Sequence, residues 1–230
     1  MTARVLVVDD EPGIRTLLRE YLRADGHEVV EAASGAEALA CFAEQPVDLV
    51  LLDIGLPDMD GLEVLRTLRR TSEVYVIMVT ARAEELDKLV GLQVGADDYV
   101  TKPFSPREVA ARVKTVLRRA RSSATVEADQ SIDVGPLRID QARREVTRDG
   151  HPVALSALQF DLLLAMSSSP GRVWSRCQLL EHVWGGDFFG DERVVDVHIR
   201  NLRRVLGDDA TSPEIIGTVR GVGYKFLPGA

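Results

Sequence analysis

The sequence predicts an α/β domain built on a doubly wound five-stranded parallel sheet, followed by a smaller α+β domain. In the first half, short apolar runs alternate five times with longer amphipathic segments, which favours a parallel sheet with helices on both faces. In the second half, short alternating segments and turn dipeptides precede three helical patterns and a final hairpin. We therefore predict a first domain over residues 1–120, a linker over 121–131 and a second domain over 132–230.

The strands of the first domain are nearly continuous apolar runs, which is typical of strands buried on both faces. Four of them are predicted at Val5–Val8, Leu49–Leu52, Val74–Val79 and Asp98–Val100. Helices are predicted near Pro12–Asp25, Gly35–Glu44, Met59–Arg70, Glu84–Val94 and Pro106–Arg119. Residues 121–130 lack apolar periodicity, so they indicate a linker.

The second domain begins with four short strands and continues with three helices. The strands are predicted at Ile132–Val134, Leu137–Ile139, Glu145–Arg148 and Val153–Leu155. The helices are predicted at Ala157–Ser167, Arg176–Val183 and Arg193–Leu206. A closing hairpin is predicted from Ile215–Val219 and Tyr224–Leu227, with Arg220 at its tip.

Composition narrows the class of protein. A hydrophobic share of 45% indicates a globular chain, and no apolar run approaches the roughly 20 residues that span a bilayer. Cys41 and Cys177 fit reduced thiols, so we expect a cytoplasmic protein without a disulfide. The net charge of −8 does not exclude nucleic acid, because Arg193–Leu206 carries four arginines and one acid.

Polar residues follow the predicted strands of the first domain. Asp9 and Asp10 follow the strand at Val5–Val8, Asp53 follows Leu49–Leu52, Thr80 follows Val74–Val79 and Lys102 follows Asp98–Val100. Because the carboxyl ends of parallel strands share one edge, these side chains should converge there. Three close carboxylates call for a hard divalent cation, most simply Mg²⁺. Any one of these aspartates could be an ordinary turn residue or helix cap, but the whole set indicates a phosphoacceptor site with Asp53 as nucleophile.

An enzyme of another class remains an alternative for the same acids. A Mg²⁺-dependent phosphatase can also use an aspartyl nucleophile, but that chemistry usually places a second acid two residues later. Gly55 occupies that position, so we expect no enzyme activity of this class.

The helix predicted at Arg193–Leu206 is strongly two-sided. Its apolar stripe consists of Val195, Ile199, Leu202 and Leu206. The opposite face is expected to present Arg193, Val197, Arg200, Asn201 and Arg204, with Arg203 and Asp196 at its borders. This layout fits a helix that enters the major groove of DNA, although a solvated amphipathic helix gives the same pattern.

The first domain resembles the receiver domain of bacterial response regulators, which has a flavodoxin-like fold. The resemblance rests on Val7–Pro12, Leu52–Gly61, Thr80–Arg82 and Gly95–Phe104. It implies that Asp53 accepts a phosphoryl group from a sensor histidine kinase. It also implies that Asp10, Asp53 and the Gly55 carbonyl bind Mg²⁺, that Asp9 helps through water, and that Thr80 and Tyr99 form a switch pair.

The second domain resembles the winged-helix effector domain of the OmpR/PhoB group. The matching segments are Leu155–Leu163, Leu179–Gly185, Asp196–Arg200 and Thr218–Phe226. The resemblance implies that Arg193–Leu206 is the recognition helix on double-stranded promoter DNA and that Arg220 enters a minor groove. The segment 185–192 resembles a loop that can touch RNA polymerase, with a packed loop as the alternative. Three residues depart from the family pattern and put its DNA sequence in doubt: Val194, Asn201 and Gly217.

The resemblance also implies a homodimer of phosphorylated chains. The residues expected at its interface are Lys88, Asp97, Asp98, Glu108, Arg112 and Arg119. Asp97 and Asp98 are expected to face Arg112 or Arg119, and Lys88 to face Glu108. The sequence thus predicts a phosphorylation-activated transcriptional regulator of a two-component system; a DNA-binding regulator that works without phosphorylation is the alternative.

Overall fold

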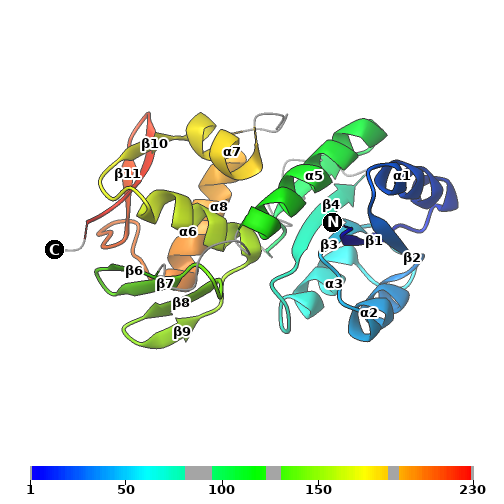
Figure 1. Cartoon of the computed structure of the whole chain (residues 1–230), viewed down its shortest axis with the longest axis horizontal. Coiled ribbons are helices and arrows are strands. Elements are labelled where there is room, and N and C mark those ends of the chain that lie inside the picture. Colours follow the sequence, from blue (N-terminus) through cyan, green and yellow to red (C-terminus); the bar gives the residue numbers. More distant parts are fainter. Residues whose placement is uncertain (1, 81–94, 123–130, 186–191, 229–230) are drawn as a thin grey trace. The chain divides into compact units, whose positions relative to one another are not determined.

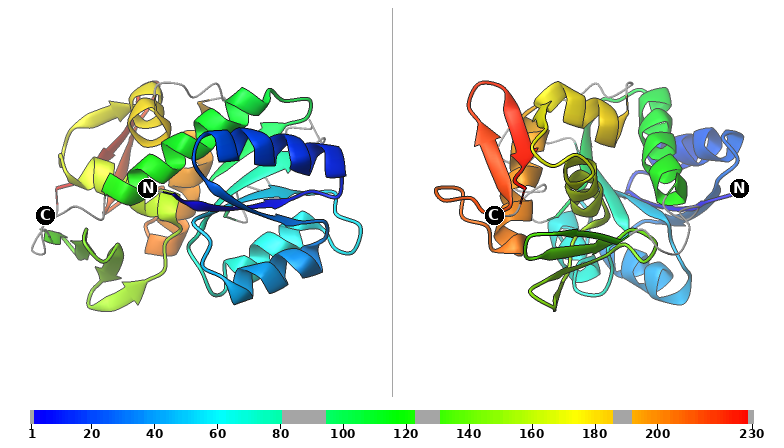
Figure 2. Two further views of the ribbon diagram at one scale, coloured as in Figure 1. Left: turned by 45° about the vertical axis from the view of Figure 1, so that its right-hand side comes forward. Right: turned by 60° about the vertical axis from the view of Figure 1, so that its left-hand side comes forward.

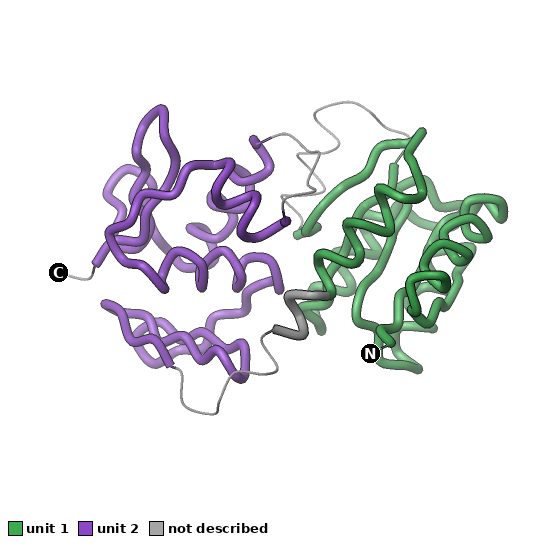
Figure 3. Tube along the Cα trace, turned by 45° about the horizontal axis from the view of Figure 1, so that its top comes forward, with its two compact units in different colours: residues 1–117 green, residues 118–230 purple. Residues whose placement is uncertain are grey.

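The computed structural model describes residues 2–80, 95–122, 131–185 and 192–228 (Figure 1). The chain divides into two compact units, residues 1–117 and 118–230 (Figure 3). Helix α5, Pro106–Ser122, runs through the point of division. The predicted helix near Glu84–Val94 and most of the predicted linker lie outside the described residues.

The first unit contains a five-stranded, all-parallel sheet in the order β2-β1-β3-β4-β5. The strands are β1 Arg4–Val8, β2 Glu28–Ala32, β3 Leu49–Asp53, β4 Tyr75–Thr80 and β5 Asp98–Thr101. The helices described with it are α1 Pro12–Ala24, α2 Gly35–Glu44, α3 Gly61–Leu68 and α5. Helices α1 and α5 cover one face of the sheet, and α2 and α3 cover the other (Figure 2). The predicted doubly wound fold is confirmed.

The order of the strands determines where a site can form. The order in which the chain adds strands reverses between β1 and β3, since β2 lies on one side of β1 and β3, β4 and β5 follow on the other. The carboxyl ends of strands at such a switch point form the usual ligand-binding crevice of open α/β sheets. Every residue of β3 and β4 is buried, which anchors this edge in the core.

The second unit has two antiparallel sheets and three described helices. One sheet is formed by β6 Ser131–Val134, β7 Leu137–Asp140, β8 Glu145–Arg148 and β9 His151–Val153. The helices are α6 Ala157–Ser167, α7 Arg176–Trp184 and α8 Arg193–Leu206. The other sheet has the order β10-β12-β11, with β10 Val173–Ser175, β12 Gly223–Phe226 and β11 Ile216–Val219. This arrangement is the winged-helix type predicted.

Two details of the second unit differ from the prediction. The fourth strand is two residues earlier than predicted, because Asp149 and Gly150 take positive φ values of 51° and 78° and turn the chain at once into β9. Strand β10 was not predicted, because it has only three residues and its partner β12 lies far along the chain.

Within the described residues, no helix is long and apolar enough to cross a membrane.

Local sequence signals fix the ends of the three helices of the second unit. Ser156 and Ser175 begin α6 and α7 with capping boxes, in which Gln159 and Gln178 reach back to the cap amides. Helix α8 ends at Gly207, whose φ of 67° suits glycine. The predicted apolar stripe of α8 is buried: Val195, Ile199, Leu202 and Leu206 are at most 1% exposed.

Candidate phosphoacceptor site and DNA-binding face

The acid pocket lies at the carboxyl edge of the parallel sheet. Lys102 Nζ lies 2.8 Å from Asp9 Oδ2 and 2.8 Å from Asp53 Oδ2. One carboxylate oxygen from each of Asp9, Asp10 and Asp53 falls within 4.8 Å of the others. Asp9 and Asp53 are 1% and 6% exposed, whereas Asp10 is open to solvent. The predicted convergence of the three acids and the lysine is therefore present.

The electrostatics of the pocket favour an added cation. Burial raises the pKa of the Asp9 carboxyl above its usual value, although the hydrogen bond from Lys102 opposes the shift. Burial by itself would lower the pKa of the Lys102 ammonium, but hydrogen bonds to Asp53 and Asp9 raise it overall. Glu11, whose Oε1 lies 3.2 Å from Lys102 Nζ, adds a fourth carboxylate. Four acids around one lysine fit a hard divalent ion with oxygen ligands such as Mg²⁺.

Arg15 holds the backbone that carries the acidic pair. Its Nη1 donates to the carbonyl oxygens of Asp9 at 2.7 Å and Asp10 at 3.0 Å. Its Nε lies 3.7 Å from Glu31 Oε2. Sequence reasoning missed Arg15 and Glu11. Only their position could have indicated these residues, because Glu11 lies just before α1 and Arg15 lies near its start, directly after the acidic pair.

Thr80 and Tyr99 lie on neighbouring strands and on the same face of the sheet. The register pairs Met78 with Tyr99 and Thr80 with Thr101, so Thr80 and Tyr99 are diagonal neighbours. Thr80 is 2% exposed and its carbonyl accepts from the Lys102 amide at 2.7 Å. Their roles as a switch pair remain a prediction.

Gly55 also lies beside the nucleophile. Its amide donates to Asp53 Oδ1 at 3.3 Å, which places the start of the β3–α3 loop against the pocket. The predicted role of its carbonyl as a metal ligand is not tested by this contact.

Exposure on α8 is narrower than predicted. Arg193, Arg200 and Arg204 are exposed on this helix, and Arg220 is exposed at the tip of the β11–β12 hairpin. Val197 and Asn201, by contrast, are 9% and 3% exposed, so the expectation that they lie on the open face is wrong. The buried face of α8 is therefore wider than the apolar stripe predicted from the sequence.

Arg203 is also buried, and its partners explain why. Its Nη2 donates to the Ile216 carbonyl at 2.5 Å and to Thr218 Oγ1 at 2.8 Å, both on β11. Its Nε lies 3.8 Å from Asp208 Oδ2. The guanidinium therefore joins α8 to the hairpin instead of pointing outward, and a contact of Arg203 with DNA stays a prediction.

Known proteins match this chain along nearly its whole length. The response regulator receiver domain family matches residues 5–114, and the family of C-terminal domains of transcriptional regulatory proteins matches residues 150–226. The sensory transduction protein RegX3 of Mycolicibacterium smegmatis is 46% identical over 96% of this chain and 98% of its own length. The DNA-binding response regulator MtrA of the same organism is 42% identical over 99% of this chain and 98% of its own length.

This chain is a response regulator of the OmpR/PhoB family. It is a two-component transcriptional regulator, with a receiver domain and a DNA-binding domain, and its family is not one of classical enzymes. Solved structures of other response regulators have a similar fold. A cysteine-to-serine mutant of RitR aligns with a TM-score of 0.81 at 29% identity, covering 99% of this chain and 100% of that chain. DrrB, an OmpR/PhoB homologue from Thermotoga maritima, aligns with a TM-score of 0.54 at 35% identity, with the same coverage.

The residues expected at a dimer interface of this response regulator are paired within the chain wherever they are described. Asp97 and Asp98 are 1% and 2% exposed. Arg69 Nη2 lies 2.8 Å from Asp97 Oδ2, and Arg112 Nη1 lies 2.7 Å from Asp98 Oδ2. Arg112 also bonds to Glu108 at 2.9 Å. The two aspartates are therefore not free surface charges. Lys88 and the side chain of Arg119 lie outside the described part.

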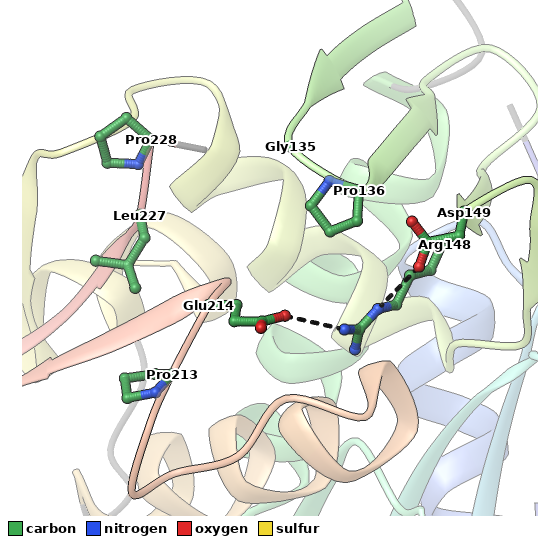
Figure 4. Close-up of a pocket in the computed structure, with 8 residues that line it drawn as sticks. All are labelled: Gly135, Pro136, Arg148, Asp149, Pro213, Glu214, Leu227 and Pro228. Atoms are coloured by element: carbon green, nitrogen blue, oxygen red, sulfur yellow. Dashed lines mark hydrogen bonds and ion pairs between the residues drawn. The ribbon is translucent and has the colours of Figure 1, made fainter. Parts of the chain in front are cut away.

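The second unit contains a groove of about 790 Å³ (Figure 4). Arg148 lies in its wall, 3.2 Å from Glu214 and 3.6 Å from Asp149, and donates to the carbonyl of Leu206, the last residue of α8. The other lining residues are Gly135, Pro136, Pro213, Leu227 and Pro228. Arg148 thus caps α8, and the groove's prolines and ion pairs offer no nucleophile.

In the loop 185–192, which was predicted to approach RNA polymerase, residues 186–191 lie outside the described residues.

Proposed function

We propose that Asp53 accepts a phosphoryl group from a sensor histidine kinase and that this switches the protein to a dimer that binds promoter DNA. The observation that carries the proposal is the position of Lys102, 2.8 Å from both Asp9 and Asp53 at the buried edge of the sheet. A lysine held there can bind phosphate oxygens as soon as a phosphoryl group arrives at Asp53.

In the proposed transfer, a carboxylate oxygen of Asp53 attacks the phosphorus of a phosphohistidine on the kinase. The P–N bond breaks, and the departing imidazole nitrogen takes up a proton. Asp9, Asp10 and Asp53 would hold Mg²⁺, together with the Gly55 carbonyl that the family resemblance implies. When bound, Mg²⁺ supplies charge screening between the incoming phosphate and the carboxylates.

The residues around Asp53 then respond to the new charge. A phosphoryl group adds about −1.5 to −2 charge, which draws Lys102 and the Thr80 hydroxyl toward it. Tyr99, the diagonal neighbour of Thr80 on β5, turns inward as Thr80 moves. Shifting a two-state population from 1:99 to 99:1 takes about 5.5 kcal/mol, which phosphate contacts and a dimer interface supply together.

On DNA, the exposed arginines of α8 contact the major groove. We assign this role to Arg193, Arg200 and Arg204, and a minor-groove contact to Arg220. A dimer presents two such helices to half-sites about one helical turn apart. The domain limits that we propose are a receiver over 1–120, a linker over 121–131 and a DNA-binding domain over 132–230, with RNA polymerase as a further partner.

Sedimentation of the full chain with Mg²⁺, with and without beryllofluoride as a phosphoryl mimic, tests the switch. We expect beryllofluoride to shift the wild type from monomer to dimer and to raise its affinity for promoter DNA. Asp53→Ala should abolish both effects. Asp60→Asn is the matched control, because Asp60 lies in the loop that follows Asp53 and caps α3 through an oxygen that asparagine retains. DNA affinity that stays the same with and without beryllofluoride would instead support a phosphorylation-independent regulator.

A further inference from the structure

Asp196 places a negative charge among the exposed arginines of the recognition helix. Arg193 precedes it by three residues and Arg200 follows it by four, so all three share one face of α8. The Asp196 side chain is 39% exposed. Non-specific binding to DNA depends on the neutralisation of phosphates, which a carboxylate on this face weakens. An acid here therefore needs a compensating role.

That role is visible in its contacts. Arg176 Nε and the Tyr224 hydroxyl both donate to Asp196 Oδ1, each at 2.7 Å. Arg176 begins α7, Asp196 lies in the first turn of α8, and Tyr224 lies on β12 of the β11–β12 hairpin, which we call the wing. One carboxylate oxygen thus joins α7, α8 and β12.

The aromatic ring of Tyr224 strengthens the same junction. The guanidinium groups of Arg176 and Arg203 lie 5.4 Å and 5.8 Å from its centre. Burial and the hydrogen bond to Asp196 raise the pKa of the Tyr224 hydroxyl to about 12, so it remains a donor at neutral pH. The junction is built from mutually satisfied groups, which fixes its geometry.

We propose that Asp196 is a positioning residue that fixes the recognition helix relative to the wing, and that it increases discrimination between operator and random DNA while it lowers overall DNA affinity. The proposal rests on the DNA contacts proposed above. Contacts with base edges require exact placement of side chains, whereas phosphate attraction does not. Removal of the carboxylate should therefore change specific and non-specific binding in opposite directions.

A competing role for Asp196 is direct reading of a base, since carboxylates accept hydrogen bonds from cytosine N4. The two roles differ in what Tyr224 does. Tyr224→Phe removes the hydroxyl that fixes the junction but leaves the carboxylate on α8. It should reduce discrimination only if Asp196 acts through geometry.

The experiment uses the full chain with Mg²⁺ and beryllofluoride. An operator is first selected from random duplex DNA with the wild type. Dissociation constants are then measured over a salt series for this operator and for a scrambled duplex of the same length. The variants are Asp196→Asn and Tyr224→Phe. Asp149→Asn, which removes one exposed acid from the β8–β9 turn where asparagine suits the positive φ, controls for net charge.

We expect Asp196→Asn to bind scrambled DNA about two- to fivefold more tightly, and its preference for the operator to fall about tenfold. Tyr224→Phe should leave scrambled binding unchanged and reduce the preference roughly threefold to fivefold. Asp149→Asn should keep the preference. Circular dichroism melting confirms that each variant is folded.

Three other outcomes overturn the inference. Unchanged preference in both Asp196→Asn and Tyr224→Phe shows that the junction does not set discrimination. Relaxed preference at a single base pair in Asp196→Asn, with Tyr224→Phe like the wild type, shows base reading instead. A wild type that selects no operator overturns the proposed function together with this inference, whereas the first two outcomes leave that function intact.

Discussion

Gly61 packs against the backbone of Asp53 with no space for a side chain. A β carbon on Gly61 would lie 2.0 Å from the Asp53 carbonyl oxygen. The Gly61 amide also donates to the Ile54 carbonyl at 2.9 Å. Because the obstructing atoms are backbone, they cannot rotate away, and any side chain must push α3 off the end of β3. The position of the nucleophile therefore depends on this glycine.

Gly61→Ala should lower the free energy of unfolding by about 1–3 kcal/mol, the usual cost of overpacking, and slow the phosphorylation of Asp53 by a small phosphodonor. Urea denaturation and the rate of phosphorylation measure the two effects. Gly13→Ala is the matched control, because Gly13 also lies in the first turn of a helix and its β carbon would meet nothing within 4 Å. That variant should be as stable as the wild type or more so. Equal losses in both variants would contradict the packing argument.

Asp9 links stability, magnesium and pH. Burial raises its pKa above 3.8, so the folded chain binds this proton more tightly than the unfolded chain. Without magnesium, the Asp9 contribution to stability falls as pH rises from 3.8 through the raised pKa, and the ionised carboxylate destabilises the fold at neutral pH. Asp9→Asn keeps an oxygen for the Glu11 amide. In EDTA at neutral pH, it should melt at the same temperature as the wild type or higher.

The same variant should lose most of the stabilisation that excess Mg²⁺ gives the wild type, because a ligand stabilises only the state that binds it. Melting curves with EDTA and with Mg²⁺ show both effects. Asp25→Asn changes an exposed acid at the end of α1 and should keep the full magnesium response. Undiminished magnesium stabilisation of Asp9→Asn would remove Asp9 from the ion site.

Arg15 should matter to the acid pocket more than its neighbour Arg19. Both arginines pair with Glu31, but only Arg15 donates to the carbonyls of Asp9 and Asp10. We expect Arg15→Gln to weaken Mg²⁺ binding about tenfold, the scale of effects seen when groups behind metal ligands are removed. Arg19→Gln should change it little, because the contact of Arg19 is with Glu31 and not with the acidic pair. Titration calorimetry with Mg²⁺ compares the two variants. Similar losses of Mg²⁺ affinity would show that the ion pairs with Glu31 support the site, and not the hydrogen bonds from Arg15 to the backbone.

The convergence of Asp9, Asp53 and Lys102 could be predicted because it follows from topology. In a parallel sheet all the strands end at one edge, so residues far apart in sequence must meet there. The bounds of α8 could be predicted for a different reason, since its apolar period is regular from Arg193 to Leu206. Strong local patterns thus determined the elements and the edge that they share.

The direction of long charged side chains could not be predicted in the same way. Helical periodicity gives the angle of Arg203 on α8, but its burial depends on Thr218 and the Ile216 carbonyl, which only the folded hairpin brings near. Likewise Asp98 and Arg112 were placed on the right elements, but their mutual pairing turns them inward. A guanidinium on a flexible stem can reach either way, so its partners decide the outcome.

Arg203 and Arg204 are adjacent and should behave as opposites. Arg203→Met removes a buried guanidinium with partners on β11 and should destabilise the DNA-binding unit by about 2–4 kcal/mol. Arg204→Met changes an exposed residue and should alter stability by less than about 0.5 kcal/mol, but it should reduce the salt slope of DNA binding by about one. Urea denaturation and binding over a salt series separate the two roles. A stable Arg203→Met with a reduced salt slope would instead place Arg203 among the DNA contacts.

Asp98 and Arg112 form a buried ion pair whose two charges depend on each other. The two side chains are 3% and 8% exposed and meet at 2.7 Å. Arg112→Met leaves the Asp98 carboxylate buried without its cation, which should cost about 3–5 kcal/mol. Adding Asp98→Asn removes that charge and should restore most of the loss. Burial raises the pKa of Asp98, so the single variant should also recover stability on acidification as the carboxyl takes up a proton.

Glu108→Gln is the matched control, because Glu108 is the more exposed partner of Arg112 and its loss should cost less than about 1 kcal/mol. The double variant also tests where the pair acts. If Asp98 and Arg112 serve only their own chain, the variant that regains stability should still form a dimer with beryllofluoride. A double variant that is stable but remains a monomer would show that the two residues act across the interface, because the fold would then be intact while the contact between chains is lost.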